Sequence, residues 1–431
     1  MIKWKSLSTF TLTALFVVLP TSFAAMPDDA LSLQDCIHQA LQNNKAIKIA
    51  VNNKDKADWT VREAQGAKGV TFSLIHKETR FNPLLANGVG DDKYTNNFAN
   101  QVAISLPVYT GGKLEGQISQ ARHNADITAL SLDAARQQLF LDTTTAYFSV
   151  LQYQDDLLVS QQTVADYIEH LNTTRDKYDA GLVAKSDVLQ TQVKLANAQD
   201  GLIIARNNYI NAAASLNNLI GRPQGQEVKL KEHLSYEPIT VTLDEATHQA
   251  LTRRPEIIQA RTGIASAEDQ ITVAKSGRLP AVLASATNSW YNDKLPGSDN
   301  SNWQISFMAS MNLFDSGVVN SQIRQAEYDL ATAKEQEQQL QESVELEVRQ
   351  QYHSLREAES RIELSKIAIN QAEEDMDIYK TRYEAGVGTN LEVMDAAVSL
   401  AAAKTNAIKA LYDYNISKAR LERAMGIAIA E

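Results

Sequence analysis

The side chains most able to carry out chemistry in this 431-residue chain are few and scattered. There is no zinc-protease helix motif, no nucleophile elbow and no phosphate-binding loop, because Gly111-Gly112-Lys113 lacks the spacing that a phosphate loop requires. His38 and His248 occupy equivalent positions in two similar segments, which favours a structural helix role over metal ligation. Met308 and Met311 would suit copper, but two methionines in one strand more often serve packing. We therefore expect no enzyme, no metal site and no cofactor.

The amino-terminus predicts export from the cytoplasm. Lys3 and Lys5 precede a short apolar segment at residues 10–19, and Ser22-Phe23-Ala24 supplies the small residues of a cleavage site. We therefore expect a signal peptide at residues 1–24. Cys36 lies too far beyond this site to carry a lipid anchor, and a single cysteine excludes an internal disulfide. We interpret Cys36 as a helix residue half packed against a neighbour.

Charge and hydropathy narrow the class of protein further. The chain has 41 basic and 52 acidic residues, so loss of Lys3 and Lys5 with the signal takes the net charge from −11 to −13. This acidic balance argues against nucleic acid and against a polybasic membrane patch. No apolar run of about 18 residues follows the signal, so no membrane-spanning helix is predicted. An exported chain of this kind is either soluble or spans the membrane as a closed barrel.

A duplication organises nearly the whole mature chain. Residues 33–41 align with 243–251 at an offset of 210, and later motifs align at a constant offset of 205. The later pairs are Val108-Tyr109-Thr110-Gly111-Gly112 with Leu313-Phe314-Asp315-Ser316-Gly317, Tyr178-Asp179-Ala180-Gly181 with Tyr383-Glu384-Ala385-Gly386, and Tyr209, Leu216 and Gly221 with Tyr414, Leu421 and Gly426. We predict two structural repeats, at 25–221 and 241–431, joined by a linker at 222–240 with prolines as breakers.

Each repeat reads as a helix, two strands, a very long helix, a turn and a return helix. Opening helices are expected at 34–67 and 244–276, and long helices without internal proline at 113–178 and 318–383. The narrow, Ala-rich apolar stripe of each long helix, with steps of three and four, suits helices packed side by side in a wall. At 1.5 Å per residue each long helix would extend roughly 100 Å. Gly181 and Gly386 would end them in the left-handed conformation.

The predicted strands at 70–79, 98–108, 281–291 and 303–313 are joined in pairs by polar loops at 82–97 and 292–302. The second and fourth strands alternate with one apolar face, which suits a lipid-facing barrel and equally an ordinary soluble sheet. Four strands cannot close a membrane barrel, since the smallest have about eight. If the strands face lipid, several copies must share one barrel, and three copies would supply twelve strands.

This plan resembles the TolC-like outer-membrane efflux proteins over essentially the whole mature chain. The motifs that carry the resemblance are the opening helices at Leu33 and Leu243, the strand ends at 107–112 and 312–317, the tip pair at 178–188 and 383–395, and the closing glycines Gly221 and Gly426. The resemblance implies a mixed α and β fold and a homotrimer. Three copies would form a twelve-stranded β-barrel in the bacterial outer membrane, surrounded by lipid, continuous with a coiled-coil helical tunnel in the periplasm.

The resemblance also implies where the channel closes. Glu392 and Asp395 match acidic positions that line the closed periplasmic entrance in the family, where three copies of each would make two negative rings. Solvated helix-surface acids are the alternative. Some relatives carry Arg at the position of Gly388, and that Arg can pair with the acid matching Asp187. Without it, either Lys185 substitutes, or the tip opens more readily, or Tyr383 and other hydrogen bonds hold it.

A periplasmic adaptor protein and an inner-membrane transporter would dock at the two turns of the tip. The residues expected there are Gly181, Leu182, Val183, Gly386, Val387 and Gly388. The implied function is the exit duct of a tripartite efflux pump that exports small molecules such as drugs. The sequence leaves two alternatives open: the outer-membrane component of type I protein secretion, and, from another class, a periplasmic adaptor or structural coiled-coil protein.

Overall fold

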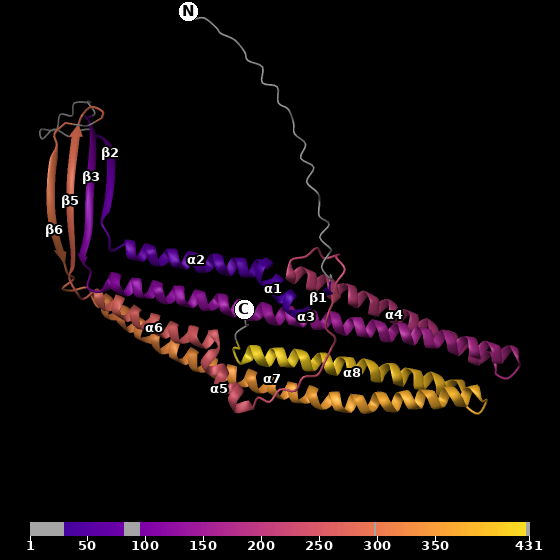
Figure 1. Cartoon of the computed structure of the whole chain (residues 1–431). Helices are drawn as coiled ribbons and strands as arrows, with labels where there is room; N and C mark the ends of the chain where they lie inside the picture. Colours follow the sequence, from indigo (N-terminus) through magenta and orange to yellow (C-terminus); the bar gives the residue numbers. More distant parts are fainter. Residues whose placement is uncertain (1–29, 82–94, 297–298, 428–431) are drawn as a thin grey trace, which may run out of the picture.

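The computed structural model describes residues 30–81, 95–296 and 299–427, with a β-sheet at one end and long helices extending away from it (Figure 1). The predicted signal peptide and most of the first strand-connecting loop lie outside the described residues. The helices are α1 Leu33–Asn43, α2 Lys45–Gly66, α3 Lys113–Asp179, α4 Lys185–Ile220, α5 Leu243–Arg253, α6 Pro255–Ser276, α7 Val318–Glu384 and α8 Asn390–Ala424. Elements α1 to α4 and α5 to α8 follow the same order, with two strands after the second helix of each set.

The prediction of one unbroken opening helix in each repeat is wrong. The first breaks at Asn44, which has extended backbone angles and whose side chain accepts a hydrogen bond from the Ala46 N–H at 2.8 Å. The second breaks at Arg254, because Pro255 has no N–H to donate to the preceding turn and begins the next helix instead. Each opening segment is therefore a helix of 11 residues followed by one of 22.

Four antiparallel strands form the sheet in the order β2-β3-β5-β6. They are β2 Thr71–Phe81, β3 Thr95–Tyr109, β5 Ala281–Asn292 and β6 Asn302–Ser310. The β6 strand ends three residues before the predicted Leu313, because its partner β5 begins at Ala281, opposite Ser310, and offers no further backbone. Strands β2 and β6 each have one edge with no partner strand in the described part of the chain.

The register gives the sheet one apolar and one polar face. Directly paired residues project from the same face, so Ile104 shares a face with Phe72 and Ala286, and Ala286 with Ile305. The other face is mostly polar and includes Ser285 and Ser306, whose hydroxyl oxygens lie 2.8 Å apart, although the pair Leu283 and Met308 also lies on it. The alternation predicted from the sequence is confirmed for β3 and β6.

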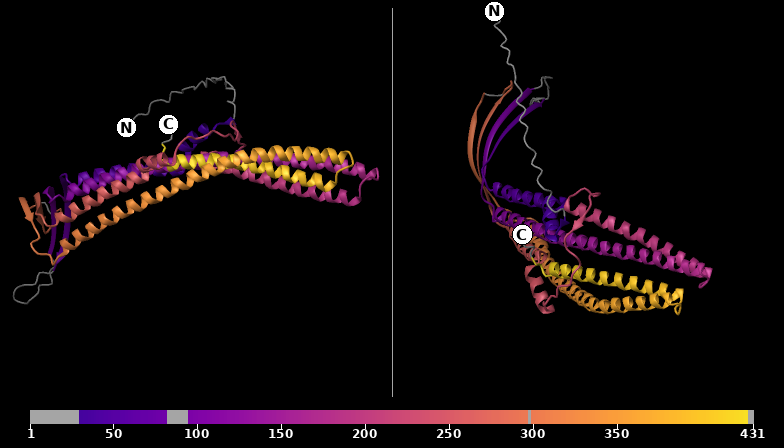
Figure 2. Two further views of the ribbon diagram at one scale, coloured as in Figure 1. Left: turned by 90° about the horizontal axis from the view of Figure 1, so that it is seen from below. Right: turned by 45° about the vertical axis from the view of Figure 1, so that its right-hand side comes forward.

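The long helices α3 and α7 each contain 67 residues and extend roughly 100 Å at 1.5 Å per residue. Near the sheet, α2 packs on α3, α3 on α6, and α6 on α7, which makes a layer with α2 and α7 at its edges (Figures 1 and 2). Farther from the sheet, α3 and α4 form one hairpin and α7 and α8 another, and α3 packs against α8 between them.

Two apolar cores lie where the short helices meet the long ones. In one core, the fully buried Tyr147 donates a hydrogen bond to the Leu31 carbonyl at 3.2 Å. In the other, the buried Tyr414 donates to the Glu237 carbonyl. Cys36 belongs to the first core and is fully buried rather than half packed, and burial raises the pKa of its thiol to about 12. The thiol is therefore unreactive at neutral pH.

The linker between the two sets of elements contains a strand that the sequence does not predict. Strand β4 (Lys229–Leu230) pairs in parallel with β1 (Ala30–Leu31), which precedes α1. This pairing holds the start of the linker against the first core.

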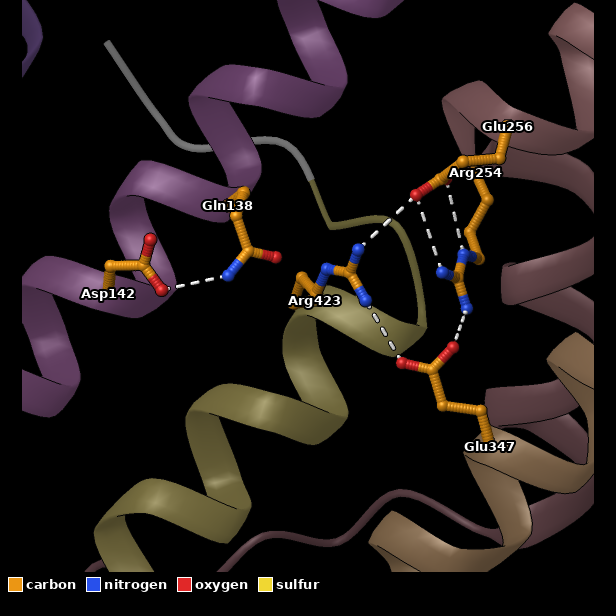
Figure 3. Close-up of polar contacts among 6 residues, drawn as sticks. All are labelled: Gln138, Asp142, Arg254, Glu256, Glu347 and Arg423. Atoms are coloured by element: carbon orange, nitrogen blue, oxygen red, sulfur yellow. Dashed lines mark hydrogen bonds and ion pairs between the residues drawn. The ribbon is translucent and has the colours of Figure 1, made fainter. Parts of the chain in front are cut away.

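A cluster of four charged side chains fixes the end of α8 (Figure 3). Arg254, whose side chain is 6% exposed, binds Glu347 of α7 at 2.6 Å and Glu256 of α6 at 3.3 Å. Arg423 of α8 reaches the same two carboxylates, at 3.0 and 3.4 Å. Two arginines and two glutamates alternate, so burial of the charge is compensated. Gly426 allows the end of α8 to approach the backbone at Arg254 closely, since a Cβ at residue 426 would lie 2.8 Å from the Arg254 backbone nitrogen.

None of the helices in the described part of the chain combines the length and the apolar character needed to cross a membrane.

Candidate gate at the helical tip

Two matching turns close the helical hairpins at the end of the molecule farthest from the sheet (Figure 1). After α3, the Gly181 N–H donates to Tyr178 O and the Leu182 N–H to Lys177 O, both at 2.8 Å. After α7, Gly386 has φ +80°, a left-handed conformation that strains other residues. Both turns show the hydrogen-bond pattern of a glycine C-cap, so the prediction that glycines end the long helices is confirmed.

Tyr383 is buried between the two hairpins and is 3% exposed. Its hydroxyl donates to the Thr174 Oγ1 at 3.3 Å, and its ring lies 5.1 Å from that of His170, centroid to centroid. Lys177 Nζ donates to the Tyr383 carbonyl at 2.5 Å and lies 4.7 Å from the ring centroid. Three residues of α3 thus hold the last turn of α7.

Asn390, at the start of α8, connects the second hairpin to both helices of the first. Its Oδ1 lies 2.7 Å from His170 Nε2 of α3 and accepts from Thr191 Oγ1 of α4 at 3.2 Å. Its Nδ2 donates to the Asp187 carbonyl at 3.2 Å. Thr191 is fully buried. Burial lowers the pKa of His170, which favours the neutral imidazole. Because Asn390 Oδ1 can only accept, the His170 Nε2–H is the donor.

The predicted gate acids have different surroundings. Glu392 accepts hydrogen bonds from the Thr389 N–H at 2.7 Å and from its hydroxyl at 3.0 Å, forming a capping box at the start of α8. These hydrogen bonds, with the backbone one contributing most, lower the pKa of Glu392. Asp395 is exposed one turn further along and, after burial, is the second cause of the raised pKa of Tyr167.

Asp187 is half-buried, and the described residues show no ion pair to its carboxylate. Lys185 does not supply the missing partner there. The guanidinium of Arg382 pairs with one gate acid, its Nη1 lying 3.8 Å from Glu392 Oε1. Hydrogen bonds to neutral groups, together with the ion pair of Lys380 with Glu169 at 2.9 Å, hold the tip.

The expected docking residues lie on the outer surface of the two turns. Leu182 and Val387 are 73% and 69% exposed. Val183 is half-buried. Gly388 packs on the end of α7, where a Cβ would lie 3.0 Å from the Tyr383 nitrogen, so a larger residue there requires the turn to shift.

Sequence reasoning missed His170, Thr174, Lys177, Thr191 and Asn390. Residues 170, 174 and 177 lie on one face of α3 by their spacing of four and three, which is a signal that a polar contact face was available. The sequence holds no comparable signal for Thr191 and Asn390, because their contacts depend on how two separate hairpins meet.

The histidines and methionines considered from the sequence as metal ligands were His38 with His248 and Met308 with Met311. His38 Nε2 lies 3.2 Å from the Gln42 amide, and Met308 and Met311 are exposed at the base of the sheet. Across the described residues, no group of three or more His, Cys, Asp or Glu side chains is arranged to hold a metal ion.

Comparison with known proteins identifies a matching family and several relatives of this chain. The family model described as "Outer membrane efflux protein" matches residues 36–222 and 246–427. The outer membrane protein TolC of Escherichia coli is 26% identical over 416 residues, which cover 92% of this chain and 82% of TolC. The alkaline protease secretion protein AprF of Pseudomonas aeruginosa is 21% identical, over 92% of this chain and 85% of AprF.

Solved structures show the same fold. The Campylobacter jejuni CmeC outer membrane channel superposes with a TM-score of 0.81 at 16% identity, covering 91% of this chain and 85% of CmeC. The family match spans most of the chain and includes both hairpins and the sheet. The chain therefore belongs to the outer membrane efflux protein family, as a TolC-like protein of the bacterial outer membrane with its helical part in the periplasm.

Proposed function

We propose that this chain is the outer-membrane exit duct of a tripartite efflux pump. Three copies form one channel, and each contributes its four strands to a twelve-stranded barrel and its long helices to a periplasmic tunnel. An adaptor protein and an inner-membrane transporter dock at the tip and open it for small molecules. The observation that carries this proposal is a two-faced sheet with two unpaired edges, continuous with a wall of helices.

The sheet supports the shared barrel. Its apolar face suits lipid, and its mostly polar face suits a water-filled lumen. Exposed strand edges cannot face lipid because their backbone groups would lack hydrogen-bond partners. In a ring of three copies, β6 of one copy pairs with β2 of the next and leaves no edge.

The tip supports a closed periplasmic entrance. Three copies of Glu392 and Asp395 form two acidic rings there, and carboxylate rings in a narrow pore favour cations. The contacts of Tyr383 and Asn390 hold α7 and α8 against the first hairpin, which keeps the entrance narrow. A docked adaptor engages the exposed Leu182 and Val387 and replaces these contacts.

Deletion of the gene from the source bacterium tests the proposed function. Efflux predicts that the mutant retains several-fold more of a small fluorescent dye and that the wild-type gene restores export. A tip variant with Leu182→Asp and Val387→Asp should reach the outer membrane but fail to restore export. Unchanged retention of every dye would contradict an efflux role.

Protein secretion is the second candidate, because AprF is named for the secretion of alkaline protease. Loss of an exported protein from the culture medium of the same deletion mutant, with dye export intact, would favour this candidate. Membership of the efflux family argues against the periplasmic adaptor that the sequence left open.

A further inference from the structure

The layer formed near the sheet by α2, α3, α6 and α7 has two edge helices, α2 and α7, whose exposed side chains are complementary in charge. Helix α2 forms one edge, where its main packing partner is α3, and α7 forms the other edge, where it packs on α6. Since β2 follows α2 and α7 follows β6, joining β6 to β2 of the next copy brings α7 beside α2 of that copy. This juxtaposition rests on the trimeric barrel of the proposed function.

The face of α2 that points away from α3 carries three lysines and one glutamate among its exposed side chains. Residues that pack on α3 recur at positions 47, 50, 54, 57 and 61, so positions 45, 49, 52, 56, 59 and 63 lie opposite them. The exposed side chains on this face are Lys45, Lys48, Ile49, Asn52, Lys56, Trp59 and Glu63. Trp59 is 65% exposed and is stacked by Arg62 at 4.4 Å.

The outward face of α7 has the opposite charge at the corresponding level. Its buried stripe includes Val319, Ile323, Ala326 and Val344. The exposed side chains on the opposite face are Arg324, Tyr328, Glu335, Glu342 and Leu346. Within the protomer, as far as it is described, Lys45, Lys48, Lys56, Glu335 and Glu342 take part in no ion pair. Tyr328 is 74% exposed.

The register between the two edges follows from the helix geometry. The α2 helix approaches the sheet and ends at Gly66, whereas α7 leaves it and begins at Val318, so the two run antiparallel. Because both rise 1.5 Å per residue, residues equally distant from the sheet lie at one level. Lys45 is then level with position 339, between Glu335 and Glu342, and Lys48 is level with position 336.

The same register places the remaining groups in compatible pairs. Glu63 lies within a turn of Arg324, and Lys56 lies level with Tyr328, one turn from Trp59. Basic residues meet acidic ones at the far end, the charges are reversed near the sheet, and aromatic rings meet between them. A cation over an aromatic ring is also favourable.

We infer that α2 and α7 form a charge-matched seam between neighbouring copies of this chain, with Lys45 and Lys48 opposite Glu335 and Glu342. The seam selects a second copy in one register. It also makes assembly of the helical wall sensitive to salt, because exposed ion pairs are screened within about 10 Å at 0.1 M salt.

Charge reversal tests the seam on the full-length protein in detergent. Lys45→Glu with Lys48→Glu should raise the dissociation rate of the trimer about tenfold at low salt, since repulsion replaces attraction in each of three seams. Glu335→Lys with Glu342→Lys should do the same, and the four changes together should restore the rate. The matched control, Lys229→Glu with Glu227→Lys, changes exposed charges on neither edge helix and should have no effect.

A disulfide cross-link tests the register independently. Ile49→Cys with Glu335→Cys places the two thiols at one level, and oxidation should link the copies covalently on a denaturing gel. Ile49→Cys with Gln322→Cys displaces one thiol by about 20 Å along α7 and should not link them. Cys36 is buried in both variants.

The outcomes separate the seam from the proposed function. A trimeric wild type whose dissociation rate is unaffected by either reversal, or is not restored by the four changes, overturns the seam and leaves the duct. Linking by the displaced cysteine pair alone overturns the register. A monomeric wild type overturns the shared barrel and the seam together.

Discussion

Replacing Asn390 with alanine should loosen the closed tip. The variant removes the acceptor of the His170 N–H at 2.7 Å and the donor to the Asp187 carbonyl at 3.2 Å. Thr191 retains an alternative acceptor, since its hydroxyl also lies 2.9 Å from the Asp187 carbonyl. His170 has no such substitute in the described contacts and keeps its N–H in a mostly buried site.

The expected change in the opening equilibrium follows from the one hydrogen-bond partner that His170 loses. A buried polar group that loses its partner costs about 1–3 kcal/mol. If the open tip lacks the Asn390 contacts, the closed state alone bears a cost of about 2 kcal/mol. Since 1.4 kcal/mol corresponds to a factor of ten, the ratio of open to closed tips should rise about 30-fold in each protomer.

Single-channel recording in a planar bilayer measures this ratio as the fraction of time spent in high-conductance states. The matched control is Asn415→Ala, which removes an asparagine from the same helix, where it donates to the Ser235 and Leu411 carbonyls far from the tip. Open-state occupancy of Asn390→Ala within threefold of wild type, or equal to that of Asn415→Ala, would refute the reasoning.

Two other substitutions should change stability in opposite directions. Glu347→Gln leaves the buried Arg254 with a single carboxylate and should lower the free energy of unfolding by about 2–4 kcal/mol, measured by denaturant titration in detergent. The control is Glu327→Gln, which removes an exposed pair with Arg324 on the same helix and should change the free energy of unfolding by less than about 1 kcal/mol. Equal effects of the two would contradict a stabilising role for the cluster. Burial, with a smaller contribution from Asp155, raises the pKa of Asp156 from 3.8 to about 6. The folded state therefore binds more protons than the unfolded state between pH 3.8 and about 6, and stability falls as pH rises through that window. Asp156→Asn should raise the melting temperature at pH 7 and lose this advantage below pH 4, and an equal gain at both pH values would point to a cause other than charge.

Periodicity predicted the elements whose patterns are local. The alternation of Ile305 and Phe307 with Gln304 and Ser306 placed β6 in a two-faced sheet, and the uninterrupted stripe of α7 predicted a helix that ends within one residue of the structure. Gly386 could be assigned to the end of that helix because a left-handed C-cap favours glycine.

The features that the sequence did not predict depend on contacts between distant segments. The break at Asn44 was missed because a single asparagine inside a helical pattern is tolerated unless its side chain caps the next turn. Arg254 is charged and would be expected at the surface, yet Glu347 arrives from α7 and compensates its charge. The network around Asn390 likewise exists only because two hairpins pack together.

Ion selectivity of the purified trimer in a planar bilayer tests the central claim most directly. The wild type should insert spontaneously and give small, cation-selective steps, read from the reversal potential across a salt gradient. Glu392→Ala with Asp395→Ala should lose most of that selectivity while still inserting, and Glu227→Ala, an exposed acid remote from the tip, should keep it. Failure of well-folded protein to insert would contradict the duct, and unchanged selectivity in the double variant would contradict an acidic gate at the tip.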